Sequence, residues 1–113
     1  MINKKEKIMH NYYLYYGISL INTEEQVFTL GISEDIFRRS YEKHMAVVWV
    51  TAYATRSEAR KAETAAKEAL DDVFDRAFVQ FGAWQMQGYK QNRGWDWWLM
   101  NGTGPLDIIK EAI

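Results

Sequence analysis

The distribution of apolar positions predicts a β-hairpin near the start of the chain, followed by a helix. Residues 11–21, NYYLYYGISLI, are rich in aromatic and β-branched side chains, as is typical of a strand. The polar stretch NTEE then provides a turn, and QVFTLGI, residues 26–32, reads as the returning strand. Ser33 is a suitable N-cap, so we predict a helix from about residue 34 to residue 44.

A third strand and a longer helix follow. VVWVTAYA, residues 47–54, is apolar at both sets of alternate positions, which predicts a strand buried on both faces. Thr55 and Glu58 have the spacing of a capping box, which opens a second helix. Its apolar stripe recurs with helical period, and its small residues indicate close packing of the helix on the sheet. The stripe consists of Ala59, Ala62, Ala66, Leu70 and Val73.

The last 40 residues have a weaker pattern. They contain four of the five tryptophans and several glycines. We predict an irregular extension over residues 74–113, with one strand near residues 95–100 and a terminal helix that begins at Pro105. The fold class is α+β in a single domain, residues 1–113. Its core, about residues 12–73, is a small mixed or antiparallel three-stranded sheet flanked by helices, in the order β-β-α-β-α.

Composition narrows the class of protein. The absence of cysteine excludes disulfides, thiolate zinc sites and cysteine catalysis. The longest nearly continuous apolar run, MAVVWVTAYA, is too short to span a bilayer, and the first ten residues lack a hydrophobic signal core. We therefore expect a cytoplasmic protein without a membrane partner. The net charge of −1 argues against a uniformly basic nucleic-acid surface, although positive residues cluster locally.

Two segments together resemble the GIY-YIG nuclease superfamily, most closely its small single-domain members. TLGISEDIFRRSYEKH, residues 29–44, is similar to the second motif of that family, a Tyr-x-Gly strand end followed by a Ser/Thr turn, an Asp and a helix with paired arginines. VVWVTAYATRSEARKAETAAKEAL, residues 47–70, is similar to the later strand and glutamate-bearing helix. The resemblance covers about residues 13–70. It implies a divalent-metal-dependent DNA endonuclease, encoded by a phage or a mobile element.

Cleavage of a phosphodiester requires a cation for the charge that develops on phosphorus, a metal ion and a proton acceptor for the attacking water. By resemblance, Arg39 faces the phosphate and Glu63 holds Mg²⁺ or Mn²⁺, hard ions that prefer oxygen ligands. Lys43 or His44 falls where the family places a basic residue that handles the nucleophile.

The tyrosine of the first motif is ambiguous. An ungapped match places Ile18 there, whereas a longer hairpin turn places Tyr16 there after an even insertion or Tyr15 after an odd one. Further candidates for contact with phosphate or nucleic acid are Arg38, Arg56, Arg60 and Thr29.

Departures from the family pattern separate fold from activity. Thr29 occupies the position of the second-motif tyrosine, and the segment after His44 is short. The alternative is a catalytically inactive GIY-YIG-fold protein that binds nucleic acid, or that inhibits a host or defence protein through its Trp-rich surface. Three roles are open for the tryptophans of this surface: they are part of the core, they stack on bases, or they bind a protein or a second copy in a homodimer. They are Trp95, Trp97 and Trp98.

Simpler roles also fit the charged candidates. Arg38 with Glu42, and Arg39 with Asp35, have the spacing of surface ion pairs on a helix. Glu63 has the spacing of one charge among several on a solvated helix face.

Overall fold

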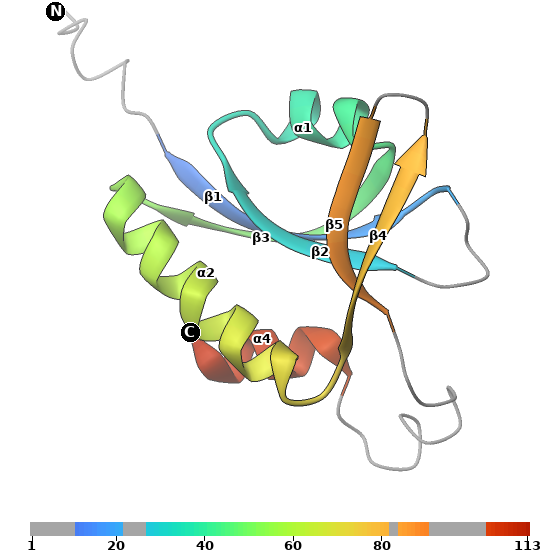
Figure 1. Cartoon of the computed structure of the whole chain (residues 1–113). Coiled ribbons are helices and arrows are strands. Elements are labelled where there is room, and N and C mark those ends of the chain that lie inside the picture. The colour runs from blue at the N-terminus through green and yellow to red at the C-terminus, as the bar shows by residue number, and fades with distance from the viewer. Residues whose placement is uncertain (1–10, 22–26, 82–83, 91–103) are drawn as a thin grey trace, which may run out of the picture.

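The computed structural model of the protein describes residues 11–21, 27–81, 84–90 and 104–113. Strands and helices alternate along the chain as shown in Figure 1. In order, they are β1 (Tyr12–Ser19), β2 (Phe28–Ser33), α1 (Ile36–Glu42), β3 (Met45–Tyr53), α2 (Arg56–Asp71), β4 (Asp75–Phe81), β5 (Trp84–Lys90) and α4 (Pro105–Ala112).

The α+β class and the β-β-α-β-α order are confirmed, but the three-stranded sheet is wrong. The strands form one five-stranded antiparallel sheet in the order β3-β1-β2-β5-β4. Part of the predicted irregular extension is instead the β4–β5 hairpin. Its side chains alternate as in other strands, with Val79 and Met86 pointing into the core and Phe78 and Gln80 pointing out. The helix beginning at Pro105 is confirmed. The strand predicted near residues 95–100, and its tryptophans, lie outside the described residues.

The two faces of the sheet have separate cores. Helices α2 and α4 cover one face and α1 lies over the other (Figure 1). The core under α2 and α4 includes Tyr16, whereas the core on the α1 face includes Tyr15. These neighbouring tyrosines therefore point to opposite faces of β1, as the alternation of a strand requires.

Strand β3 is not buried on both faces, contrary to the sequence prediction. In the described part of the chain it is an edge strand of the sheet, with β1 as its one neighbour. Trp49 and Tyr53 pack against the core under α2, but Val48 and Val50 are exposed. An apolar pattern alone does not distinguish an edge strand from a central one. None of the helices in the described ranges has the length and apolar character needed to traverse a lipid bilayer.

The helix starts differ in how well the sequence predicts them. The Thr55 hydroxyl accepts a hydrogen bond from the Glu58 N–H at 3.2 Å, so the predicted cap of α2 is confirmed. Ser33 does not cap α1. Its hydroxyl accepts from the Asp35 N–H at 3.0 Å, and the Asp35 carboxylate is the cap, accepting from the Arg38 N–H at 3.0 Å. The chain therefore makes one more polar turn before α1 begins.

Candidate functional site

Strand β2 has an open edge next to α1. It pairs with β1 along its length, but its pairing with β5 is limited to Phe28 opposite Tyr89. Beyond that pair, no strand in the described part of the chain is hydrogen-bonded to the outer edge of residues 30–33. Side chains from α1, β1 and α2 can therefore meet at this edge.

Tyr15 reaches the open edge because it lies across a glycine. Tyr15 on β1 is paired directly with Gly31 on β2. A Cβ atom at position 31 would stand 2.6 Å from the Tyr15 hydroxyl oxygen and 2.8 Å from the ring carbon that bears it. Only a residue without a side chain permits this close approach. The ring is consequently buried, with 6% of its surface exposed.

Two opposite charges act on the Tyr15 phenol. Burial raises its pKa above the ordinary value, the Arg39 guanidinium lowers it, and the Glu63 carboxylate raises it. Tyr15 comes from β1, Arg39 from α1 and Glu63 from α2, so charges from two other elements act on this phenol. Tyr15 and Arg39 line different cavities, and Glu63 lines neither of them. A phenol is protonated at neutral pH and can donate a hydrogen bond, and the raised pKa of Tyr15 makes loss of that proton still less favourable.

The two adjacent arginines of α1 have different surroundings. The Arg38 side chain is 75% exposed and pairs with Glu42 at 2.6 Å, as the simpler interpretation expected. Arg39 forms no ion pair with Asp35. Only its backbone N–H donates to the Asp35 carbonyl, at 3.1 Å. Among the residues that the structure describes, the Arg39 guanidinium has no carboxylate partner. It is available for an anion from outside.

Glu63 does not lie on a solvated face. Its side chain is only 14% exposed, and among the described residues it pairs with Lys67, one turn further along α2, at 3.5 Å. Over the described ranges, no group of three histidine, cysteine, aspartate or glutamate side chains is placed to hold a metal ion. A single carboxylate nevertheless suits Mg²⁺, which keeps several of its waters and is bound through one or two carboxylates. The chemistry of Glu63 therefore fits such an ion.

A cavity of about 290 Å³ lies beside Tyr15 on the α1 face and is also lined by Thr29 and Lys43. The Thr29 side chain is buried, and its hydroxyl donates to the Gln87 carbonyl at 2.7 Å. This bond joins β2 to β5 next to their one backbone pair. Of the two basic candidates, Lys43 lies in this cavity, whereas His44 is exposed in the turn to β3, with a left-handed φ of 47°.

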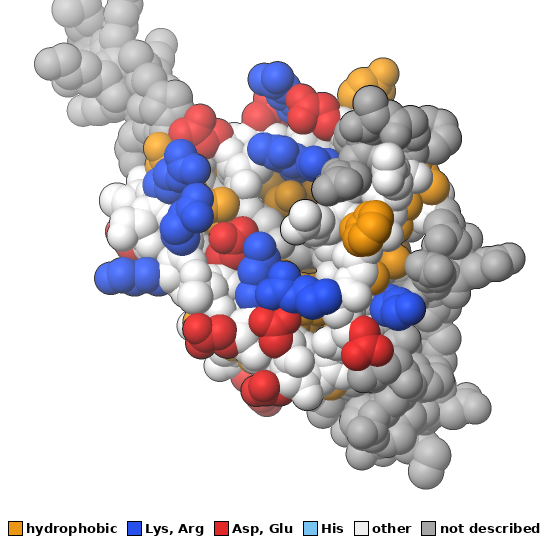
Figure 2. Space-filling view, in the orientation of Figure 1, with side chains coloured by type: hydrophobic (Ala, Val, Ile, Leu, Met, Phe, Trp, Pro, Cys, Tyr) orange, Lys and Arg blue, Asp and Glu red, His pale blue; other side chains and the backbone are white. Residues whose placement is uncertain are grey.

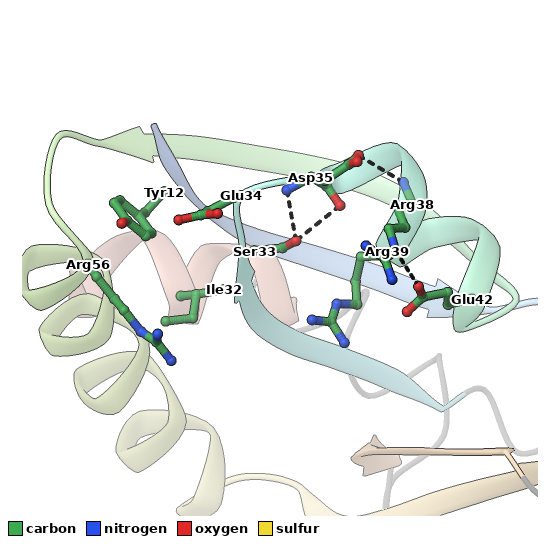
Figure 3. Close-up of a pocket in the computed structure, with 9 residues that line it drawn as sticks. All are labelled: Tyr12, Ile32, Ser33, Glu34, Asp35, Arg38, Arg39, Glu42 and Arg56. Carbon is green, nitrogen blue, oxygen red and sulfur yellow. Dashed lines mark hydrogen bonds and ion pairs between the residues drawn. The ribbon is translucent and has the colours of Figure 1, made fainter. Parts of the chain in front are cut away.

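A second cavity, of about 390 Å³, lies between α1, the end of β2 and the start of α2. In Figure 3, Arg39 and Arg56 extend towards β2 from its two sides. Tyr12 and Glu34 also line it, although neither is among the predicted site residues. The hydrogen bond to Glu34 raises the pKa of Tyr12, and Arg56 lowers it. The register of the hairpin, Tyr13 opposite Ser33, is the feature that could have predicted this contact.

Two predicted site residues lie elsewhere. Arg60 is exposed on α2 and lines neither cavity. Tyr16 is in the core under α2, edge-to-face with Phe28 at 5.5 Å between ring centres, and burial raises its pKa to about 12. Figure 2 shows Lys and Arg side chains over α1 and α2 on one face of the molecule, with Asp and Glu side chains between them.

Comparison of the chain with protein-family models, curated proteins and solved structures gives no match. Its function therefore has to be inferred from the side chains of the site.

Proposed function

We propose that this protein is a divalent-metal-dependent endonuclease that hydrolyses phosphodiester bonds in DNA, of the GIY-YIG type. One observation carries the proposal. The Tyr15 phenol lies within the electrostatic influence of both the Arg39 cation and the Glu63 carboxylate, at an open strand edge. A phenol donor, a cation with no carboxylate partner among the described residues and a poorly solvated carboxylate are groups that phosphodiester hydrolysis can use.

Each side chain has a distinct role in this proposal. Arg39 binds the phosphate and balances the negative charge that develops on its oxygens. Tyr15 retains its proton at neutral pH and donates a hydrogen bond to a phosphate oxygen. Glu63 would hold Mg²⁺ or Mn²⁺, and the ion would supply Lewis-acid charge for the reaction. Lys43 lines the cavity on the other side of Tyr15 and adds a second cation.

Nicking of supercoiled plasmid with Mg²⁺ or Mn²⁺ tests the proposal. The parent chain should nick, and Arg39→Ala and Glu63→Gln should each slow nicking by about 100-fold or more, as removal of a transition-state donor does elsewhere. Lys61→Ala and Glu68→Gln are matched controls, since both residues are exposed on α2, unlike Glu63, and neither charge acts on the Tyr15 phenol. No nicking by the parent, or equal rates in the site and control variants, would refute it.

A specific observation favours the second candidate, an inactive fold that binds nucleic acid. Thr29, which stands in the place of the family's second-motif tyrosine, is buried, and its hydroxyl donates a hydrogen bond to the Gln87 carbonyl. In that case the protein binds DNA with an affinity that falls steeply with salt, because phosphate contacts release counterions. Arg39→Ala weakens this binding, and no metal ion produces cleavage.

A further inference from the structure

Two aromatic side chains on α1 are almost completely exposed. Phe37 is 90% exposed and Tyr41 is 84% exposed. They are one turn apart on the same side of the helix, so their rings are neighbours. Helix α1 buries none of its seven residues, and neither ring contributes to the two cores. We call these two residues the α1 ridge.

We infer that the α1 ridge stacks unpaired bases, so that the substrate of the neighbouring site is single-stranded nucleic acid or an unpaired segment within it. The inference deepens the proposed function and rests on it for the class of substrate. Every base has a π-face, and aromatic side chains beside a cationic track are the usual platform for single strands. Rings in this position have no comparable use on a duplex, because the base faces of a duplex are stacked on each other.

The cationic track lies on the adjacent side of the same helix. Arg38, next to Phe37 in sequence, lines the larger cavity and is itself mostly exposed. Arg39 and Arg56 line the same cavity, and neither forms an ion pair with another described residue. A strand whose phosphates lie in this cavity would pass its bases over α1.

The carboxylates that line the cavity do not cancel this attraction for phosphate. Asp35 accepts the Arg38 backbone N–H as the cap of α1. Glu42 accepts from the Arg38 side chain, and the Glu34 carboxylate acts on the neighbouring Tyr12 phenol, whose pKa it raises. Two of the three acids therefore already have donors, whereas Arg39 and Arg56 have no carboxylate partner among the described residues.

A partner protein fits this surface less well. Specific protein interfaces bury roughly 800 Å² on each side around an apolar centre. The α1 ridge consists of two rings, and charged Arg38 and Glu42 adjoin it on the helix. The mixture of rings and arginines matches the chemistry of a nucleic-acid strand.

Fluorescence anisotropy in EDTA tests the inference without cleavage. The probes are a labelled oligothymidine of about 12 nucleotides, within the usual site size for single strands, and a duplex of the same length. The parent should bind the single strand more tightly. Phe37→Leu with Tyr41→Leu should weaken binding to the single strand by about tenfold or more and leave duplex binding unchanged, since leucine retains apolar surface but cannot stack. Phe78→Leu, at an exposed ring on the distant strand β4, should match the parent.

Three results would overturn the inference. The first is equal or tighter binding of the duplex by the parent, and the second is unchanged single-strand binding by the double variant. The third is a parent dimer, seen by sedimentation, that the double variant abolishes without affecting single-strand binding, because the ridge would then bind a second copy. If the ridge-dependent preference is found but the parent cleaves no DNA with Mg²⁺, the proposed nuclease function fails and this inference stands.

Discussion

Replacement of Thr29 by valine removes a buried hydroxyl and preserves the shape of the side chain. The hydroxyl donates to the Gln87 carbonyl at 2.7 Å and links β2 to β5 where they share one backbone pair. Loss of such a bond, with the acceptor left partly buried, costs about 1–3 kcal/mol. Because Gln87 itself is on the exposed side of β5, we expect the lower part of this range, about 1–2 kcal/mol.

Urea and thermal unfolding measure this loss. For a domain of this size, about 1 kcal/mol lowers Tm by roughly 4 °C, so Thr29→Val should lower Tm by about 4–8 °C. Thr51→Val is the control, since Thr51 is half-buried in β3 and its side chain makes no hydrogen bond to the other described residues. Equal effects of the two substitutions would refute a structural role for the Thr29 hydroxyl. A large loss of nicking with unchanged Tm would show instead that the Thr29 hydroxyl contacts the phosphate.

Two further predictions concern the tyrosines of β1. Gly31→Ala should displace the Tyr15 ring, cost about 1–3 kcal/mol and slow nicking at least tenfold. Gly104→Ala, at the uncrowded N-cap of α4, should cost less and leave nicking unchanged. Burial raises the pKa of Tyr16 from about 10 in the unfolded chain to about 12 in the folded protein. The folded state therefore favours the neutral phenol, and the stability that this provides is present below pH 10 and lost towards pH 12. Tyr16→Phe should therefore reduce the fall in urea midpoint between pH 10 and pH 12, and an unchanged fall would contradict this.

The features that the sequence predicted best depend on near neighbours in the chain. The Thr55 cap and the alanine stripe of α2 are set by spacings of three and four residues, and both are present in the structure. Pairing of the β1–β2 hairpin is also local. Such patterns need no knowledge of the rest of the fold.

The features that the sequence does not predict depend on contacts between residues that are far apart in the chain. The β4–β5 hairpin joins the sheet through Tyr89 opposite Phe28, 61 positions earlier. The alternation of apolar and polar residues in β4 is short, and the tryptophans and glycines that follow it do not continue a strand pattern. Likewise, the Thr29 hydroxyl bonds to a carbonyl 58 residues away, and no local pattern indicates that partner.

The choice between Tyr15 and Tyr16 shows the same limit within the candidate site. Neighbouring strand residues point to opposite faces, so one residue of uncertainty in the hairpin leaves the face undetermined. In the structure, the glycine opposite Tyr15 leaves room for its ring on the α1 face, towards Arg39. Identical side chains one position apart thus lie in different environments.

This difference allows the most direct test of the site. Plasmid nicking should be compared for the parent, Tyr15→Phe and Tyr16→Phe, each of which loses one hydroxyl and keeps its ring. A site formed by Tyr15, Arg39 and Glu63 predicts that Tyr15→Phe slows nicking by about 100-fold and that Tyr16→Phe leaves it near the parent rate. Equal rates for the two variants, or the larger loss in Tyr16→Phe, would contradict the assignment of the active site to the open edge of β2.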